Sequence, residues 1–319
     1  MSTPHAYEDP PLDPGIAQAG ARAASLGAKP RDLRDIPGAR EQMRLEQSWW
    51  RERQTALAEV RDDTLAVGGR DARIRIYRPR AEAAGPLVLY LHGGGWCIGD
   101  IDTHDNAARG VAAAADAVVV SLDYALAPEA PFPQAHEETL AAVAALRGEA
   151  GQRLGLDARV LMLAGDSAGA NLALAAAMAL RDAGTPVQGL ALFYGAFDTR
   201  LDTGSYRRFG DGRYGLSQFE MARFFDYYLA GSDHSNDCRA APLCGNLAGL
   251  PPAYLLACGL DVLRDDTLAL AAALARAGVR HRLDLLPGAT HGFLRYGPEV
   301  PLTQEAFDAA GSFLRAISR

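Results

Sequence analysis

The chain has 319 residues, of which 49% are hydrophobic and 22% charged, and its formal net charge is −7. This composition is typical of a soluble globular protein. The charges are spread along the chain without a basic stripe, so we expect no nucleic-acid partner and no anionic membrane surface.

The N-terminal segment, residues 1–58, is predicted to form helices, with Trp49 and Trp50 near the end of the second one. Its first stretch, MSTPHAYEDPPLDPG, is acidic and proline-rich and lacks the basic and apolar regions of a secretory signal. No apolar run in the chain approaches the ~18 residues that a spanning helix needs. We therefore expect no membrane association and a cytoplasmic location.

Short β-rich runs alternate with helical patterns from about residue 60 onward. The first two runs resemble edge strands, whereas the middle ones are apolar throughout, as strands buried on both faces are. The predicted strands cover residues 64–67, 73–79, 86–92, 117–124, 159–165, 189–195, 253–259 and 281–288. The helical patterns cover 104–116, 134–150, 168–183, 264–278 and 303–317. This alternation predicts an α/β fold with a mostly parallel, eight-stranded sheet between helices.

An insertion at residues 197–235 interrupts the alternation between the sixth and seventh strands. It contains glycine-rich turns and the amphipathic segment SQFEMARFFDYYLAG. Five side chains of this helix would form one wide apolar face: Phe219, Met221, Phe224, Phe225 and Tyr228. We expect this helix to cover a site at the carboxyl end of the sheet. The alternative is that its aromatic residues only pack the helix against the rest of the protein.

The pentapeptide Gly165-Asp166-Ser167-Ala168-Gly169 lies between the fifth predicted strand and the following helix. It has the form G-x-S-x-G, in which a strained turn lifts the serine hydroxyl above the sheet and the glycines allow close approach. The first N–H groups of the helix then face any anion that forms beside the serine. We expect Ser167 to be a nucleophile and Asp166 to support the turn through hydrogen bonds.

A serine nucleophile needs a base and a carboxylate that orients the base. His291 lies in the loop LPGATHGF after the last strand, and Asp261 follows the seventh strand at the same edge of the sheet. Asp265 and Asp266 are alternatives to Asp261, but they fall where a helix begins, and acids there normally stabilise the helix N-terminus. The order Ser167, Asp261, His291 is the chain order of α/β-hydrolases.

Three glycines, Gly93, Gly94 and Gly95, follow the third strand in YLHGGGWCIGD. Backbone N–H groups can approach an oxyanion where no Cβ intervenes, so the sequence predicts an oxyanion hole here. The spacing fits neither of the common phosphate-binding glycine motifs. His92 is expected to fix this loop by hydrogen bonding. Four other histidines are expected to be solvated or locally bonded: His5, His136, His234 and His281.

The cysteines at positions 97, 238, 244 and 258 form no C-x-x-C pair and have no histidine cluster beside them. The sequence therefore predicts no zinc or other metal site, and no motif for a cofactor is found. We expect buried or free thiols, with a bridge between Cys238 and Cys244 as an alternative under oxidising conditions.

The motifs HGGGW, DYALAPE, GDSAGAN, DVLRDD and HGF, in this order, resemble those of the hormone-sensitive-lipase-like (bacterial family IV) esterases. The resemblance spans roughly residues 60–317 and implies an α/β-hydrolase fold with a helical cap. Residues 1–58 and 197–235 would form the cap, and residues 59–196 and 236–319 the catalytic domain. One departure is Ala125, where the family commonly has an arginine, in a loop that takes no part in the chemistry.

The resemblance also implies a role for each candidate residue. Ser167 would be the nucleophile, His291 its base and Asp261 the partner of the base. Three N–H groups would form the oxyanion hole: those of Gly94, Gly95 and Ala168. It leaves open whether Gly93 also donates, and it is compatible with a homodimer.

The expected function is hydrolysis of short- to medium-chain carboxylic esters through an acyl-enzyme, with a small-molecule ester as substrate. One alternative is an amidase or formamidase, since the same acyl-enzyme route cleaves amides. Another is a ligand-binding protein on an inactive hydrolase scaffold, although such proteins typically lack the histidine.

Overall fold

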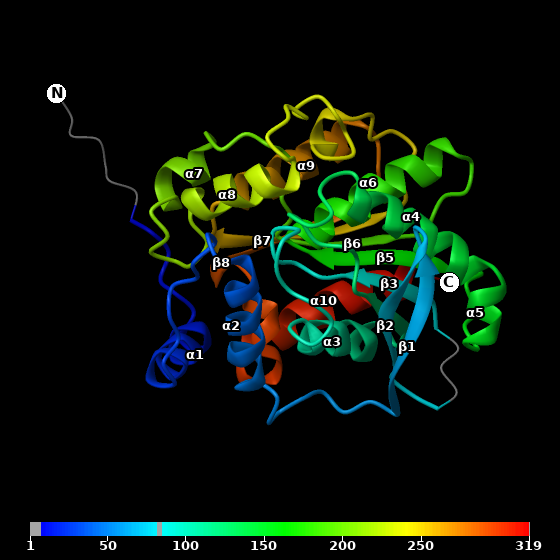
Figure 1. Cartoon of the computed structure of the whole chain (residues 1–319), viewed down its shortest axis with the longest axis horizontal. Helices are drawn as coiled ribbons and strands as arrows, with labels where there is room; N and C mark the ends of the chain where they lie inside the picture. The colour runs from blue at the N-terminus through cyan, green and yellow to red at the C-terminus, as the bar shows by residue number, and fades with distance from the viewer. Residues whose placement is uncertain (1–7, 82–84, 319) are drawn as a thin grey trace.

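An eight-stranded sheet forms the centre of the structure, a computed structural model that describes residues 8–81 and 85–318 (Figure 1). The strand order is β1-β2-β4-β3-β5-β6-β7-β8. β2 pairs antiparallel with β1 and with β4, whereas every other pair is parallel. The strands are β1 (Glu59–Val67), β2 (Arg70–Arg78), β3 (Leu87–Leu91), β4 (Val118–Leu122), β5 (Leu161–Asp166), β6 (Leu190–Phe193), β7 (Ala253–Leu260) and β8 (His281–Thr290). The predicted fold class is confirmed.

β1 differs most from its predicted bounds, because it begins at Glu59 rather than at residue 64. The first half of this strand is charged, so it lacks the apolar pattern that marks the other strands. In the structure its charges pair with β2 across the ladder. The guanidinium of Arg78 lies 2.9 Å from Glu59, and Arg75 donates to Asp62 at 3.0 Å. Cross-strand pairs of opposite charge stabilise such an edge.

Helices cover both faces of the sheet (Figure 1). α3 and α10 pack on one face, and α4, α6 and α9 pack on the other. The helices are α1 (Pro14–Ser25), α2 (Ile36–Ser48), α3 (Asp105–Ala115), α4 (Gln134–Arg147), α5 (Glu149–Arg153), α6 (Ala168–Asp182), α7 (Gly204–Phe209), α8 (Gln218–Tyr228), α9 (Arg264–Arg276), α10 (Pro301–Ile317) and the 3₁₀ turns η1 (Pro242–Cys244) and η2 (Phe293–Glu299). Across the described ranges, no helix has both the length and the apolar character that a membrane span requires.

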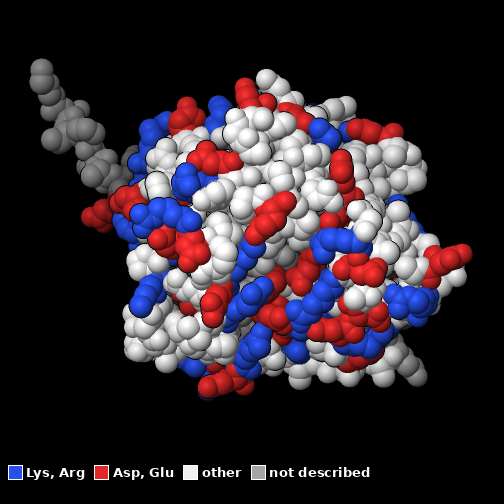
Figure 2. Space-filling model, viewed as in Figure 1, with Lys and Arg blue, Asp and Glu red and all other residues white. Residues whose placement is uncertain are grey.

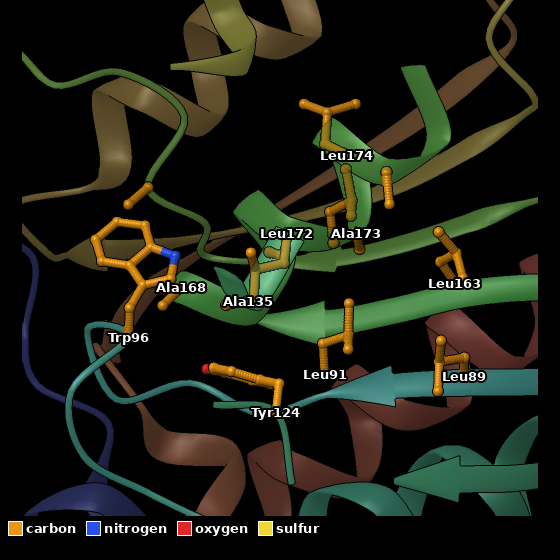
Figure 3. Packing of buried hydrophobic residues seen from close by; sticks show 14 of the residues in the cluster. Leu89, Leu91, Trp96, Tyr124, Ala135, Leu163, Ala168, Leu172, Ala173 and Leu174 are labelled. Atoms are coloured by element: carbon orange, nitrogen blue, oxygen red, sulfur yellow. The ribbon is translucent and has the colours of Figure 1, made fainter. Parts of the chain in front are cut away.

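The sheet has a hydrophobic core on each face, because successive side chains of a strand point to opposite faces. In β3, Leu89 and Leu91 belong to the core beneath α6, whereas Val88 and Tyr90 belong to the core beneath α3 and α10. Figure 3 shows Leu89 and Leu91 together with Leu163 of β5 on the side that α6 covers. The alanine-rich face of α6 lets this helix lie close to the sheet, which places its N-terminus at the end of β5.

The N-terminal segment and the insertion contact each other at one end of the sheet (Figure 1). The hydroxyl of Tyr227 in α8 donates to the carbonyl of Leu33, 2.9 Å away, between α1 and α2. The hydroxyl of Tyr214, between α7 and α8, donates to Asp9 at 3.0 Å. Two regions that are far apart in the sequence are therefore joined by direct hydrogen bonds.

The predicted apolar face of α8 is wrong in one residue. Four of its members are buried: Met221, Phe224, Phe225 and Tyr228. Phe219 is instead 67% exposed. At about 100° per residue, Phe219 lies on the side of the helix opposite to the centre of the other four. It belongs to the solvent face, in the first turn after the Ser217 capping box.

His136 is also placed differently from the expectation of a solvated or locally bonded side chain. It lies in α4, is 2% exposed, and its Nδ1 finds no partner within the described ranges. Burial, together with the charge of Arg239, lowers the pKa of His136 to about 4. His281 is locally bonded, with Nδ1 2.9 Å from the carbonyl of Val279, and His5 lies outside the described residues.

Candidate active site

Ser167 occupies a strained turn between the end of β5 and the start of α6. Its φ is 54° and its ψ −119°, a conformation that non-glycine residues seldom adopt. The turn is tight because a Cβ on Gly169 would lie 1.9 Å from the carbonyl oxygen of Leu91 in β3. Only glycine allows this contact, and the contact holds Ser167 at the carboxyl edge of the sheet.

The structure brings Ser167, His291 and Asp261 into one hydrogen-bonded row. Asp261 directly follows β7, and His291 directly follows β8, so both lie at the strand ends beside Ser167. The Nε2 atom of His291 is 2.9 Å from the Ser167 hydroxyl, and Nδ1 is 2.8 Å from an Asp261 carboxylate oxygen. The hydrogen-bond network assigns the proton to Nδ1, which leaves Nε2 able to accept the serine proton.

Both ends of this row are fixed by their surroundings. The other carboxylate oxygen of Asp261 accepts the N–H of Leu263 at 3.0 Å, and the carboxylate is buried. The ring of Tyr194 packs edge-on against the His291 ring, with centroids 5.0 Å apart. The imidazole is therefore held from two sides. Tyr194 was not predicted from the sequence, because it follows β6 without a motif of its own.

The loop after β3 presents backbone N–H groups close to Ser167. Gly94 has a φ of 117°, and a Cβ there would lie 2.0 Å from the carbonyl oxygen of Ile98, so this turn requires glycine. The N–H groups of Gly94, Gly95 and Ala168 donate to no acceptor in the described part of the chain. The cavity that contains Ser167 and His291 is also lined by these three residues.

A family model described as the alpha/beta hydrolase fold matches residues 88–295, which is well over half of the chain. The chain belongs to this family. Esterase LipI of Mycobacterium tuberculosis is 38% identical over 273 residues, covering 83% of this chain and 85% of the relative. Ethyl acetate hydrolase of Pseudomonas putida is 35% identical over 244 residues, covering 74% and 76%.

Solved structures give the same assignment. The thermostable carboxylesterase EstE1, cloned from a metagenomic library, has a TM-score of 0.85 and 35% identity, and the match covers 89% of this chain and 98% of that one. The hyperthermophilic esterase of the archaeon Pyrobaculum calidifontis has a TM-score of 0.88 and 33% identity, with 96% and 99% covered. The predicted membership of the hydrolase in the hormone-sensitive-lipase-like family is confirmed.

In this hydrolase, Asp166 joins the nucleophile turn to the glycine loop. One carboxylate oxygen accepts the Tyr90 hydroxyl at 2.7 Å and the N–H of Gly93 at 3.0 Å, and the other lies 3.5 Å from Nε2 of His104. Burial would raise the pKa of Asp166, but His104 and the Tyr90 hydroxyl lower it to about 2. The N–H of Gly93, whose role was left open, is directed at Asp166.

His92 lies behind the same loop and is buried. Its ring stacks on Tyr124 with centroids 4.3 Å apart, and its Nδ1 is 2.8 Å from the carbonyl oxygen of Gly93. Burial, together with the neighbouring His104, lowers the pKa of His92 to about 4. This neutral, stacked imidazole supports the loop, as the sequence led us to expect.

Among the described residues, the carboxylate that binds Nδ1 of His291 is that of Asp261, and neither alternative, Asp265 or Asp266, caps α9 with its side chain. Asp266 accepts the N–H groups of Phe197 at 2.9 Å and Asp198 at 3.1 Å, and Asp265 accepts the N–H of Ser205 at 2.8 Å. Burial raises the pKa of Asp266 to about 8, although the two N–H groups oppose this shift. Both acids lie in the first turn of α9, as the sequence predicted, but neither caps it, and their carboxylates instead accept N–H groups of the insertion.

The cavity beside Ser167 has a volume of about 330 Å³. Its walls come from the N-terminal segment, the insertion and the segment after β8. The apolar and aromatic part of the lining includes Met43, Trp49, Trp50, Leu216, Met221, Phe224 and Tyr296. The predicted aromatic residues Phe225 and Tyr228 lie outside it, and both pack on Trp96.

Proposed function

We propose that this chain hydrolyses carboxylic esters through an acyl-enzyme formed on Ser167. The observation that carries the proposal is the row of hydrogen bonds from Asp261 to His291 at 2.8 Å and from His291 to Ser167 at 2.9 Å. The chain is a carboxylesterase of a family whose relatives include a carboxylesterase and an ethyl acetate hydrolase. A serine, a base and an orienting carboxylate are the groups that acyl transfer requires.

The reaction runs in two steps. Ser167 Oγ attacks the ester carbonyl carbon while its proton passes to Nε2 of His291, and Asp261 stabilises the resulting imidazolium. The carbonyl oxygen becomes an oxyanion that accepts N–H groups of Gly94, Gly95 and Ala168. His291 then returns the proton to the leaving alkoxide oxygen, and the alcohol departs. A water molecule then attacks the acyl carbon while His291 takes one of its protons. His291 returns this proton to Ser167 Oγ as the bond between Oγ and the acyl carbon breaks, which releases the carboxylic acid and free Ser167.

Residues 8–58 and 197–235 form the cap in this proposal, and the catalytic domain comprises residues 59–196 and 236–318. The hydrogen bonds between Tyr227 and Leu33 and between Tyr214 and Asp9 support a joint cap. Both cap segments line the cavity. We infer that they form an end wall that limits the acyl chain to short or medium length.

Two alternatives have direct tests. An amidase would hydrolyse the isosteric amide of an ester as well as the ester, whereas a carboxylesterase should leave the amide almost unhydrolysed. A non-catalytic binding protein would not be labelled stoichiometrically by an organophosphonate, which reacts with an activated serine.

The decisive experiment replaces the nucleophile. Ser167→Ala should lower kcat on p-nitrophenyl butyrate by a factor on the order of 10⁴ or more, and His291→Ala by a similar factor. Ser121→Ala is the matched control, because Ser121 is also buried but lies in β4, outside the cavity. A Ser167→Ala protein that kept a tenth of wild-type kcat would exclude this mechanism.

We further propose a homodimer through β8, which among the described residues pairs with a strand on one side only and meets the N-terminal segment at Gly288. Leu285 in this edge strand is 44% exposed, which a second copy would cover. Light scattering on the purified protein tests this, and a monomer at micromolar concentration would contradict it. The cytoplasmic location is proposed from composition alone and is tested by cell fractionation.

A further inference from the structure

Two arginine side chains line the catalytic cavity, and neither has a carboxylate of the described residues at hydrogen-bond distance. Arg31 lies between α1 and α2, and Arg295 lies in η2, just after His291. Among residues 8–81 and 85–318, the carboxylate nearest to the Arg31 guanidinium is that of Glu46, at 3.8 Å, and the buried Nε of Arg31 finds no hydrogen-bond partner there. The guanidinium of Arg295 forms no hydrogen bond or ion pair with any described residue.

Arg295 is held in place by its backbone rather than by its guanidinium. Its carbonyl oxygen accepts the side-chain amides of Gln47 at 3.0 Å and Asn106 at 3.1 Å. The Nε of Arg295 lies 3.5 Å from the position that a Cβ on Gly292 would occupy. The charged group is thus beside the catalytic loop, and the fold does not use its donors.

The carboxylates that line the same cavity differ from the two arginines, because each carboxylate already accepts hydrogen bonds from the protein. Glu220 accepts the N–H and the hydroxyl of Ser217, at 2.9 and 2.8 Å. Glu46 accepts the side-chain amide of Gln42 at 2.8 Å, and Asp166 is bound as described above. The cavity wall therefore offers unused donors on two guanidinium groups.

Several other arginines of the protein bind a carboxylate closely. Acidic and basic side chains lie beside one another on the face shown in Figure 2. Arg70 binds Glu138 through two nitrogens, at 2.8 and 2.7 Å, and Arg40 binds Glu129 at 2.8 and 2.7 Å. This two-point geometry is the usual way in which a guanidinium binds a carboxylate. Neither Arg31 nor Arg295 makes such a two-point contact with a carboxylate of the described residues.

The positive charge in the cavity is also unfavourable without an anion. Burial and the nearby guanidinium of Arg295 lower the pKa of Arg31, although Glu46 and Glu220 act in the opposite direction. A bound anion would relieve both the desolvation and the repulsion between the two guanidinium groups.

We propose that Arg31 and Arg295 bind a free carboxylate of the substrate, so that the preferred esters are anionic. Half-esters of dicarboxylic acids and acyl esters of hydroxy acids have this chemistry. The proposal rests on the assignment of the cavity as the esterase site. The two arginines determine specificity, while Ser167, His291 and Asp261 carry out the reaction.

The test compares pairs of substrates that differ only in charge. Monoethyl adipate and its carboxamide, ethyl adipamate, place the charge on the acyl side. γ-Acetoxybutyrate and γ-acetoxybutyramide place it on the alcohol side. Wild-type kcat/KM should favour the carboxylate of at least one pair by roughly ten- to a hundredfold, as charge-assisted hydrogen bonds do. Hydrolysis of p-nitrophenyl butyrate reports separately whether the esterase site works.

Variants locate the source of this preference. Arg31→Gln and Arg295→Gln should each reduce the carboxylate-to-carboxamide ratio, mainly through KM, and Arg295→Lys should retain part of it. Arg34→Gln is the control, because Arg34 is exposed and pairs with Asp32 outside the cavity, and it should keep the wild-type ratio.

The proposal is overturned if wild type hydrolyses p-nitrophenyl butyrate but shows a ratio near one, or below one, for both pairs. It is also overturned if both glutamine variants keep the wild-type ratio, a readout that does not depend on how much protein is folded. Loss of hydrolysis of every ester by wild type would instead refute the esterase assignment on which the proposal rests.

Discussion

Replacing Asp166 by alanine tests whether the nucleophile turn positions the oxyanion loop. The substitution removes the acceptor for two donors, the Tyr90 hydroxyl and the N–H of Gly93. Asp166 is 1% exposed, so water cannot readily replace its carboxylate. A buried donor left without a partner costs about 1–3 kcal/mol, so the free energy of unfolding should fall by about 2–6 kcal/mol.

The effect on activity follows from the place of Gly93, directly before the predicted oxyanion donors Gly94 and Gly95. Once the N–H of Gly93 is released, the loop can shift, and a displacement of about 1 Å can cost roughly 10²-fold in rate. We expect kcat of Asp166→Ala to fall by about that factor, with a smaller change in KM, since the lost interaction acts mainly in the transition state.

Tyr90→Phe is the matched control, because it removes one hydrogen bond of Asp166 and leaves the bond to Gly93 intact. It should cost about 1 kcal/mol of stability and leave most of kcat. Both variants are measured by urea unfolding and by p-nitrophenyl butyrate hydrolysis at one pH. If folded Asp166→Ala retains wild-type kcat, or if Tyr90→Phe loses more kcat than Asp166→Ala, Asp166 does not position the loop.

Three further predictions concern the cavity, the carboxylate and pH. Rates on p-nitrophenyl esters should rise from acetate, at about 0.8 kcal/mol per buried methylene, peak between about four and eight carbons, and drop steeply by about twelve. Deleting residues 1–40 should flatten this profile, and a preference for emulsified long-chain triglycerides would contradict it. Asp261→Asn should lower kcat by about 10⁴-fold. Asp266→Asn should mainly change stability, because its amide oxygen can still accept two N–H groups. The reverse order of effects on kcat would show that Asp261 is not the carboxylate that orients His291. Burial and Arg239 lower the pKa of His136 in the folded protein to about 4. Between about pH 6.5 and 4 the His136 imidazole is therefore protonated in the unfolded chain but not in the folded one, and stability falls as the pH falls. His136→Gln should therefore lose about 2 kcal/mol less unfolding free energy than wild type between about pH 7 and pH 5, and equal losses in both proteins would contradict the buried, neutral imidazole.

The strands and the candidate triad were predictable because their signals are local. A buried parallel strand is an apolar run of a few residues, and its carboxyl end necessarily meets those of its neighbours. Ser167, Asp261 and His291 each follow such a run, so they could be placed at one edge without knowledge of side-chain packing. β1 was partly missed because its stability comes from charge pairs with β2 rather than from apolar residues.

The partners of a polar side chain were much harder to predict, because they depend on contacts between distant segments. Asp266 begins a helix in the sequence, which suggested a role at that helix, yet its carboxylate binds backbone N–H groups of Phe197 and Asp198. Tyr90 offered a weak signal, as a hydroxyl within an otherwise apolar strand that must find a partner when buried. The partner itself, Asp166, could not be deduced from β3 alone.

The residues that line the cavity were equally hard to predict, because they come from distant segments. Their origin also indicates which part of the chain can change substrate specificity. The hydrogen-bonded row depends on strand ends that the sheet fixes relative to one another. Arg31 and Arg295 instead come from the α1–α2 connection and from η2, and they meet only because the N-terminal segment packs beside the loop after β8. A change in that segment can alter the charge that a substrate meets without moving Ser167, His291 or Asp261. If Arg31 binds the substrate as we propose, part of the choice of ester is therefore encoded in the N-terminal segment, outside the strand ends that hold Ser167, His291 and Asp261.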